Sequence, residues 1–255
     1  MSFRVGLDLG STAIKAVFAE EGKFLWRGVI PTAPGQESVA SGLIETGLNE
    51  TGRGRGDIAG IASTGYGKKL FTSAASNIDE ITANAAGAYA LSGGEARVVI
   101  NVGGQDVKVI YLDGRGAVKD FKMNDKCAAG TGRFLELAAR IIDAPISDFD
   151  RLAKNSSREV EINSTCVVFA ESEIVSLMAR GAGREDIVRA IYASVARRVA
   201  GMAGQCDGDG AVYLDGGAAC NRGLAEALED EMMTPVRVLD APQYTVAYGA
   251  ALSLG

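Results

Sequence analysis

The stretch VGLDLGSTAIKAV, residues 5–17, matches a second stretch, VVINVGGQDVKVI, residues 98–110. The two align at a constant offset of 93 positions, the difference between residues 101 and 8. In both, apolar residues flank a short glycine-containing segment, a pattern that predicts a strand, a tight turn and a second strand. Three pairs of distinctive residues match: Asp8 with Asn101, Gly10 with Gly103, and Lys15 with Lys108. The chain therefore contains an internal repeat.

The segments after each copy extend the repeat into two α/β halves. A turn and an alternating strand follow at residues 20–30 in the first half and at residues 113–123 in the second. Helical patterns are expected at residues 37–49, 78–91, 134–142, 170–180 and 185–203. A strand at residues 57–65, and a strand, glycine turn and helix at residues 211–232, complete the prediction.

Glycine turns of this kind suit phosphate binding, because the backbone can approach a phosphate closely and present its N–H groups. A single such turn is most often only a hairpin. Two copies in register, with a third glycine turn in LDGG at residues 214–217, favour a bound ligand. We expect two domains, residues 1–92 and 93–255, with a cleft between their facing turns. The P-loop motif G-x-x-x-x-G-K-[ST] is absent from the sequence, which excludes a P-loop NTPase.

The composition narrows the partners and the chemistry. The chain has 255 residues and a formal net charge of -6, and this acidic balance disfavours nucleic acid as a partner. There is no run of about 18 apolar residues and no secretory signal, so we expect a cytoplasmic protein without a membrane partner. Histidine is absent, which excludes His-dependent triads and His-bearing zinc sites.

Four cysteines remain as candidate ligands. They lie at positions 127, 166, 206 and 220 without C-x-x-C spacing, and a cytoplasmic chain disfavours disulfides. Cys127 precedes a small-residue loop at residues 128–132. We expect it at the start of a helix, where N–H groups and the helix dipole favour a thiolate. A free cysteine is usually a small buried hydrophobe, and we expect that role for Cys206 and Cys220.

Several motifs resemble those of the acetate and sugar kinase, heat-shock chaperone and actin superfamily of ATPases, over nearly the whole chain. GLDLGSTAIK looks like the first phosphate motif, INVGGQDVK like the second, and VYLDGGAACN like the adenosine motif. EITANAAGAYAL looks like the connecting helix whose leading acid, here Glu80, lies near the metal and the attacking water. The resemblance implies the actin-like ATPase fold, with two similar α/β halves and a nucleotide cleft between them.

Two longer stretches, NDKCAAGTGRFLE and STCVVFAESEIVS, narrow the resemblance to one branch. They are similar to the cysteine motifs of the activator ATPases of 2-hydroxyacyl-CoA dehydratases, a family with relatives among benzoyl-CoA reductase subunits. This resemblance implies a homodimer in which Cys127 and Cys166 of both chains share one [4Fe–4S] cluster. It also implies ATP-coupled transfer of a low-potential electron from a donor such as ferredoxin or flavodoxin to an iron–sulfur dehydratase or reductase component.

The resemblance also assigns roles to individual residues. Those expected to face the ATP phosphates are Gly10, Ser11, Thr12, Gly103, Gly104 and Gln105. Those expected to hold Mg²⁺ through its waters or to orient the attacking water are Asp8, Glu80 and Asp106. Glu80, Asp106 and Gln105 would form the catalytic set, and Gly216 and Gly217 would pass beneath the adenosine.

Other assignments leave two roles open or depart from the family pattern. Lys15 is either a partner of the phosphates or a strand lysine that faces solvent. Glu136 would reach the ribose or lie on a solvated helix face, and Gly132 would let the backbone come close to a cofactor. The family's second phosphate motif usually opens with aspartate, whereas this chain has Asn101. Asp106 is the candidate for supplying the missing carboxylate from the same turn.

Three other functions fit part of the sequence. A small-molecule kinase of the same superfamily, similar to pantothenate kinases, would turn over ATP with a small acceptor and would contain no iron. A non-catalytic nucleotide-binding assembly protein would bind Zn²⁺ with all four cysteines, although their spacing lacks the pairs that are typical of structural zinc sites. The third alternative keeps the electron-transfer chemistry but makes the chain a permanent subunit of a larger reductase.

Overall fold

The computed structural model describes residues 2–125, 127–163, 166–204 and 210–255, and internal contacts divide the chain into two compact units. Unit 1 comprises Met1–Arg97, Tyr111–Asp120 and Leu239–Gly255, and unit 2 comprises Val98–Ile110 and Phe121–Val238. The C-terminal segment belongs to unit 1, so the two units are not two continuous pieces of chain. The division into domains at residues 92 and 93 stays a prediction.

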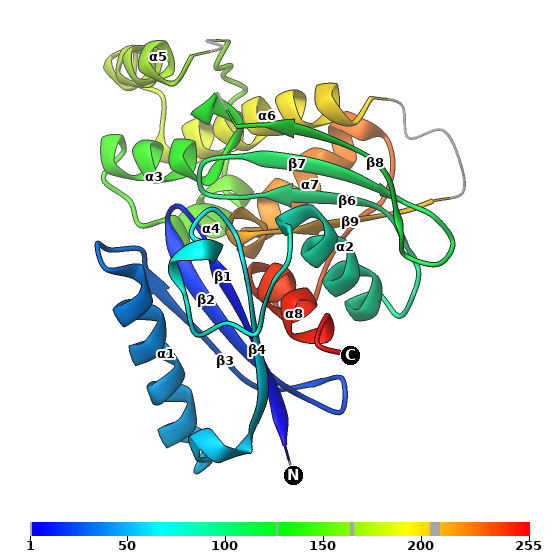
Figure 1. Ribbon diagram of the computed structural model, residues 1–255. Helices are drawn as coiled ribbons and strands as arrows, with labels where there is room; N and C mark the ends of the chain where they lie inside the picture. The colour runs from blue at the N-terminus through cyan, green and yellow to red at the C-terminus, as the bar shows by residue number, and fades with distance from the viewer. Residues whose placement is uncertain (1, 126, 164–165, 205–209) are drawn as a thin grey trace. The chain divides into compact units, whose positions relative to one another are not determined.

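Unit 1 contains a five-stranded sheet with the order β3-β2-β1-β4-β5 (Figure 1). Its strands are β1 (Phe3–Leu9), β2 (Ala13–Glu20), β3 (Lys23–Pro31), β4 (Ile58–Thr64) and β5 (Ser76–Asn77). β1 pairs antiparallel with β2 and parallel with β4, while β2 pairs antiparallel with β3. The three consecutive strands predicted at the start of the chain are confirmed.

Helices cover both faces of this sheet. They are α1 (Gln36–Thr51), α2 (Glu80–Leu91) and α8 (Thr245–Leu252). On β2, Ile14 and Phe18 belong to the core that includes Ile44 of α1. Val17 on the same strand belongs to the core that includes Tyr248 of α8. This alternation follows from the two-residue period of a strand, and Figure 1 shows α1 and α8 on opposite sides of the sheet.

The second sheet repeats the order of the first, as β10-β9-β6-β7-β8. Its strands are β6 (Ala96–Val102), β7 (Val107–Leu112), β8 (Val118–Asn124), β9 (Ala211–Asp215) and β10 (Val236–Val238). β6, β7 and β9 take the places that β1, β2 and β4 have in the first sheet. The internal repeat read from the sequence is therefore confirmed in the topology.

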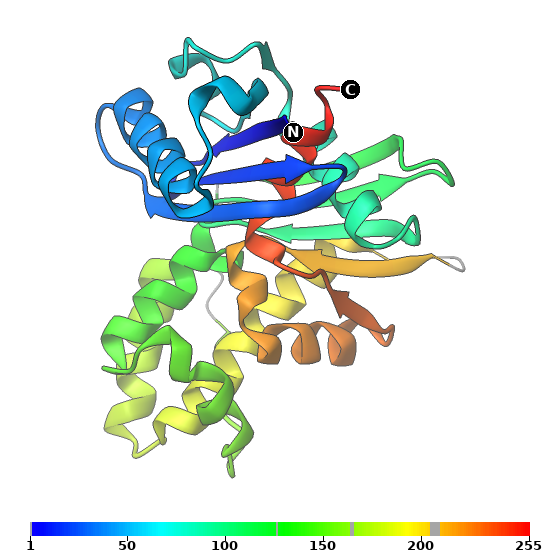
Figure 2. The same ribbon diagram turned by 90° about the horizontal axis from the view of Figure 1, so that it is seen from below.

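Most helices of unit 2 follow the second hairpin. They are α3 (Gly132–Ile141), α4 (Phe149–Lys154), α5 (Val167–Ala179), α6 (Arg184–Ala203) and α7 (Arg222–Met232). α6 and α7 pack against each other and lie side by side in both ribbon views (Figure 2). None of the helices in the described part of the chain combines the length and the apolar character that crossing a bilayer requires.

The helix expected at residues 134–142 is confirmed as α3, but Cys127 does not lie at the N-terminus of that helix. Cys127 precedes the short 3₁₀ helix η3 (Ala128–Gly130), and α3 begins only at Gly132. Thr131 lies between them in an extended conformation and interrupts the helical path. Cys166, in contrast, directly precedes α5, which begins earlier than the expected residue 170. The helix N-terminus that we expected beside Cys127 therefore lies beside Cys166.

Candidate functional site

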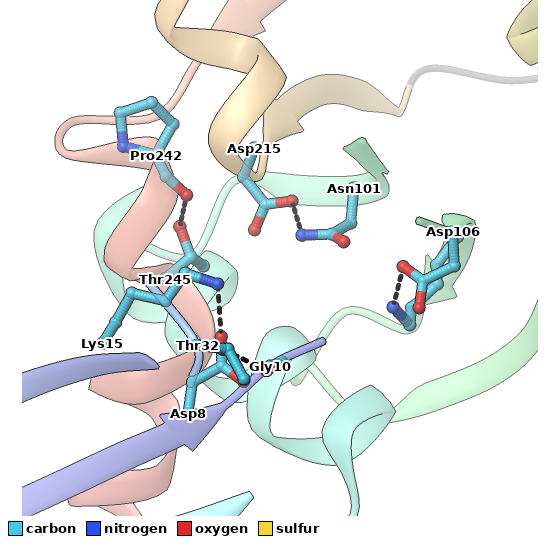
Figure 3. A network of polar contacts seen from close by, with 10 residues as sticks. Asp8, Gly10, Lys15, Thr32, Asn101, Asp106, Asp215, Pro242 and Thr245 are labelled. Carbon is cyan, nitrogen blue, oxygen red and sulfur yellow. Dashed lines mark hydrogen bonds and ion pairs between the residues drawn. The ribbon is translucent and has the colours of Figure 1, made fainter. Parts of the chain in front are cut away.

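The first phosphate turn is built around a buried ion pair in unit 1. Asp8 on β1 lies opposite Lys15 on β2 in the strand register. The Lys15 Nζ lies 3.0 Å from the Asp8 Oδ2, and Asp8 is only 5% exposed. Figure 3 shows this contact beside the turn. The structure thus gives Lys15 a carboxylate partner within the turn, and its contact with the phosphates stays a prediction.

The backbone of the same turn is held by Thr32, the residue that follows β3. Gly10, Ser11 and Thr12, all half-buried, connect β1 to β2. The Thr32 hydroxyl donates to the Gly10 carbonyl at 2.8 Å, and the Thr32 N–H donates to the Thr12 carbonyl at 3.0 Å. A Cβ on Gly10 would lie 2.8 Å from the Ala13 carbonyl oxygen, so a side chain does not fit there.

Thr64 is a residue of this site that the sequence reasoning missed. It ends β4 and lies opposite Asp8 in the register of β1 and β4. The Asp8 Oδ1 and the Thr64 Oγ1 are buried and have no hydrogen-bond partner among the described residues. A buried carboxylate oxygen without a donor is costly. A water bound to Mg²⁺ would satisfy it, so Asp8 fits the cation that the sequence implies.

Glu80 occupies the first position of α2, and the residue before it fixes the helix end. Asp79 is the N-cap, and its Oδ1 accepts a hydrogen bond from the Thr82 N–H at 2.8 Å. Partial burial favours the neutral acid, but the hydrogen bonds from Thr82 and the charge of Lys68 outweigh it and lower the pKa of Asp79. Glu80 itself is half-buried. The helix therefore holds Glu80 in a defined, partly accessible position.

The second phosphate turn lies in unit 2 and contains its own buried ion pair. The Gly103 N–H donates to the Asp106 carbonyl at 2.9 Å and closes the turn. The Lys108 Nζ lies 2.6 Å from the Asp106 Oδ1, and Lys108 is only 1% exposed. Gln105 is exposed at the tip of the turn, and Gly104 beside it is half-buried. Asp106 is thus buried together with a cationic partner, the ammonium group of Lys108.

Asn101 pairs with an acidic residue that was not among the predicted site residues. The Asn101 Nδ2 donates to the Asp215 Oδ1 at 2.8 Å, as Figure 3 shows. Asn101 is 4% exposed, and Asp215, the last residue of β9, is fully buried. Asp215 is the second residue of the LDGG motif at residues 214–217. Its place directly before the glycine turn is the one sequence signal that could have identified it.

The two glycines after Asp215 differ in whether a side chain would fit at their position. Gly216 has a φ of +89°, and a Cβ there would lie 2.4 Å from the Val102 carbonyl oxygen. Gly217 is exposed, and a Cβ there would meet no atom within 4 Å. Close backbone approach at Gly216 is therefore built into the fold, whereas Gly217 leaves open space above the turn.

A pair of hydrogen bonds joins the second phosphate turn to α3. The Gly132 N–H donates to the Gly103 carbonyl at 2.8 Å, and the Arg133 N–H donates to the Gly104 carbonyl at 2.9 Å. These two donors belong to the first turn of α3, where N–H groups lack partners within the helix. Glu136 forms an exposed ion pair with Arg133 at 3.2 Å. The turn and the helix after the cysteine loop are thus in direct contact.

The two predicted cluster cysteines both belong to unit 2 and carry thiols rather than a disulfide. Cys127 is half-buried and its N–H donates to the Asn124 Oδ1 at 3.2 Å, while Cys166 is exposed. Burial lowers the pKa of the Arg198 guanidinium, and the charge of Cys127 opposes this effect, so the two side chains interact.

Whether these thiols could hold a [4Fe–4S] cluster depends on how many ligands one chain supplies. Within the described ranges, no three or more His, Cys, Asp or Glu side chains gather as a metal-binding group. Cys127 and Cys166 of one chain would supply two of the four thiolates that a [4Fe–4S] cluster needs, so a second chain would have to supply the other two. Cys206 lies outside the described residues.

Cys220 does not have the buried position that we expected. It is exposed at the end of the 3₁₀ helix η5 (Gly217–Cys220). Neighbouring atoms nevertheless desolvate its thiol and raise the pKa of Cys220, which disfavours a thiolate. The expectation of burial was wrong, and the thiol remains a poor candidate ligand.

Several known proteins are similar to this chain over nearly its whole length. The 2-hydroxyisocaproyl-CoA dehydratase activator of Clostridioides difficile is 40% identical over 98% of this chain and 94% of its own length. The activator of lactoyl-CoA dehydratase from Anaerotignum propionicum is 38% identical over 98% of this chain and 96% of its own length. A benzoyl-CoA reductase subunit from Thauera aromatica is 32% identical over 99% of this chain and 93% of its own length.

A solved structure extends the similarity to the fold. The activator of the 2-hydroxyisocaproyl-CoA dehydratase from Clostridium difficile, with bound ADPNP, aligns with a TM-score of 0.93 and 41% identity. The alignment covers 98% of this chain and 93% of the other. Together with the repeated sheet topology, it confirms the actin-like ATPase fold. Residues 5–253 match the model of one family, and the chain therefore belongs to the BadF/BadG/BcrA/BcrD ATPase family.

Proposed function

We propose that this chain is an ATP-dependent activator that delivers a low-potential electron to an iron–sulfur 2-hydroxyacyl-CoA dehydratase or a related reductase. A donor such as ferredoxin or flavodoxin would lose one electron, the partner enzyme would gain it, and ATP would be hydrolysed to ADP and phosphate. The observation that carries the proposal is the near full-length similarity to dehydratase activators. The two surface thiols at Cys127 and Cys166 support it independently.

ATP would be held by the two glycine turns and the adenosine turn. The residues proposed to contact the nucleotide are Gly10, Ser11, Thr12, Gly103, Gly104, Gln105, Gly216 and Gly217. Asp8, with one buried oxygen that lacks a donor, would accept a hydrogen bond from a water of Mg²⁺. Glu80, fixed at the start of α2, would orient the attacking water. Phosphoryl transfer depends on such positioning and charge neutralisation more than on covalent catalysis.

Cys127 and Cys166 would ligate the cluster together with the same residues of a second chain. When bound, a [4Fe–4S] cluster supplies a one-electron carrier whose potential depends on burial and hydrogen bonds. Small residues after Cys127, from Ala128 to Gly130, would leave backbone room beside the thiolate.

The surface around Cys166 supports a second copy of this chain as the partner. Val168 and Phe169, in the first turn of the helix that Cys166 precedes, are 67% and 68% exposed. Val175 on the same helix is also exposed. Large apolar side chains grouped on one helix are typical of an interface. A homodimer would cover this helix and bring four cysteines together.

The hydrogen bonds between the second phosphate turn and α3 provide a mechanical link. A nucleotide whose phosphates reposition Gly103 and Gly104 would act directly on the N–H groups of Gly132 and Arg133. α3 starts five residues after Cys127, so its movement would be passed to the cysteine loop. We infer that ATP binding and hydrolysis change the position of this loop and thereby control electron release.

One alternative function, that of a permanent subunit of a larger reductase, is supported by a separate observation. The similarity to the benzoyl-CoA reductase subunit fits a permanent component of a larger reductase, with the same ATP and thiol chemistry. The two arrangements differ in whether the chain dissociates from its partner. Gel filtration of the chain with and without a candidate dehydratase component distinguishes them.

The test of the proposal is ATP turnover by protein purified without oxygen. An activator releases free phosphate with no small acceptor, and its reduced chromophore is reoxidised only when nucleotide and the partner enzyme are both present. Asp8→Ala should bind Mg·ATP poorly. A kinase would instead accumulate a phosphorylated product when its acceptor is added. Acceptor-dependent product formation by iron-free protein would contradict the proposal.

A further inference from the structure

The ends of two neighbouring strands are equivalent in the two units. In unit 1, Asp8 near the end of β1 lies opposite Thr64 at the end of β4. In unit 2, Asn101 takes the place of Asp8 in the repeat, and Asp215 ends β9, the neighbour of β6. Asp215 therefore occupies the place that Thr64 has in unit 1.

The backbone after these residues confirms the equivalence. Gly65, after Thr64, has a φ of +84°, and Gly216, after Asp215, has a φ of +89°. A Cβ on Gly65 would lie 2.7 Å from the Leu9 carbonyl oxygen, and a Cβ on Gly216 would lie 2.4 Å from the Val102 carbonyl oxygen. Leu9 and Val102 are themselves matched by the sequence repeat. Both units thus build the same strand end with the same left-handed glycine.

The two units place the carboxylate on different strands of this common framework. Unit 1 has an acid on β1 and a hydroxyl on β4, whereas unit 2 has an amide on β6 and an acid on β9. The Asn101 Nδ2 donates to the Asp215 Oδ1 at 2.8 Å, and both residues are buried. This hydrogen bond fixes the amide so that its oxygen, an acceptor for a water proton, lies at the end remote from that contact.

We propose that Asp215 supplies the carboxylate that Asn101 lacks, and that the Asn101–Asp215 pair is the unit 2 anchor for the water shell of nucleotide-bound Mg²⁺. Carboxylate and amide oxygens are the acceptors that this cation and its waters favour. The inference rests on the proposed function, because it requires that the chain binds Mg·ATP. Asp215 is a positioning residue here, acting through Asn101 and through water.

Asp106 fits this role less well than the sequence suggested. It lies within the turn, after the strand end, and its Oδ1 is bound by the Lys108 Nζ at 2.6 Å. Asp8 also has a lysine partner, but its Oδ1 is buried without a donor among the described residues and is left for a water of Mg²⁺. Asp215, in contrast, lies at a strand end, in the place equivalent to that of Thr64 beside Asp8.

A carboxylate swap tests the proposal. The probe is Mn²⁺ with ADPNP, and electron paramagnetic resonance measures free Mn²⁺ in the presence of the full-length protein. Asp215→Asn should weaken Mn²⁺ binding by about 10-fold to 100-fold, the usual effect of removing an outer-shell partner. Metal-free ADP affinity should stay unchanged. The double variant Asn101→Asp with Asp215→Asn returns the acid to the repeat position and should recover most of the lost affinity.

The single variant Asn101→Asp is the matched control. It places two carboxylates at hydrogen-bond distance, so one of them must keep a proton or the fold loses stability. Its melting temperature should fall, and the double variant should reverse that fall. If Asp215→Asn does not fold, the double variant still decides, because it retains one acid and one amide.

Two results would overturn the inference. One is wild-type Mn²⁺ affinity in folded Asp215→Asn, and the other is a folded double variant that binds Mn²⁺ no better than Asp215→Asn, or far more weakly than wild type. A wild-type protein that binds neither Mn²⁺·ADPNP nor ADP would instead refute the proposed function. The two failures are therefore distinguishable in the same titration.

Discussion

Replacing Gly216 by alanine would force a side chain into a backbone position that has no room for it. The φ of Gly216 is +89°, and an alanine Cβ would lie 2.4 Å from the oxygen and 2.8 Å from the carbon of the Val102 carbonyl. Both neighbours are backbone atoms at the end of β6, so they cannot rotate away as a flexible side chain could. The turn must therefore shift as a whole.

The expected cost follows from two contributions. A left-handed conformation costs an L-residue about 1–2 kcal/mol, and forcing an extra carbon into a packed region costs about 1–3 kcal/mol. Together they predict a loss of about 2–5 kcal/mol. At about 2–4 °C per kcal/mol for a chain of this size, the melting temperature should fall by about 4–20 °C. Differential scanning calorimetry of nucleotide-free protein measures this directly.

The neighbouring glycine provides the matched control. Gly217→Ala adds the same methyl group one residue later, where a Cβ meets no atom within 4 Å. Its melting temperature should stay close to that of the wild type. Gly216→Ala and Gly217→Ala with the same melting temperature would refute the reasoning from close backbone approach.

Three further predictions concern acid stability, coupling and turnover. Hydrogen bonds, led by the one from the Arg158 N–H, lower the pKa of Asp186, so its stabilisation is present above the usual aspartate range and is lost as the pH falls through the folded pKa. Asp186→Asn should therefore lower the melting temperature at neutral pH more than in acid, and an equal shift at every pH would contradict this. A Cβ on Gly132 would lie 3.3 Å from the Gly103 carbonyl oxygen. Gly132→Ala should thus reduce the change in hydrogen exchange of α3 on ADPNP binding, and an unchanged response would exclude that link. Glu80→Gln should bind ATP normally but release phosphate about 10²–10⁴-fold more slowly, as for loss of a group that handles a proton, and wild-type release would remove Glu80 from the catalytic set.

The repeated architecture could be predicted from sequence because it depends on local patterns. Alternating apolar residues on both sides of a glycine turn determine a strand hairpin, and two copies in register determine its duplication. The long helices α1, α2 and α6 were found for a similar reason, since each contains several turns of periodic sequence. α4 and α8 were missed, because segments of 6 and 8 residues contain too few periodic positions.

The site was only partly predictable, because its missing members lie far apart in the sequence. Asn101 and Asp215 are separated by 114 residues, and no local pattern announces their hydrogen bond. Thr64 meets Asp8 only through the parallel register of β1 and β4. The position of Cys127 was misjudged for a local reason: the 3₁₀ helix after it and the extended Thr131 separate Cys127 from the N-terminus of α3.

Iron content of cysteine variants, purified without oxygen, tests the central claim most directly. Wild-type protein should contain about four iron ions per dimer, the number in one [4Fe–4S] cluster. Cys127→Ser and Cys166→Ser should each lose the cluster and its brown colour. Cys220→Ser, which removes an exposed thiol outside the proposed ligand set, should retain both. Full iron content in folded Cys166→Ser would contradict a cluster shared between two chains.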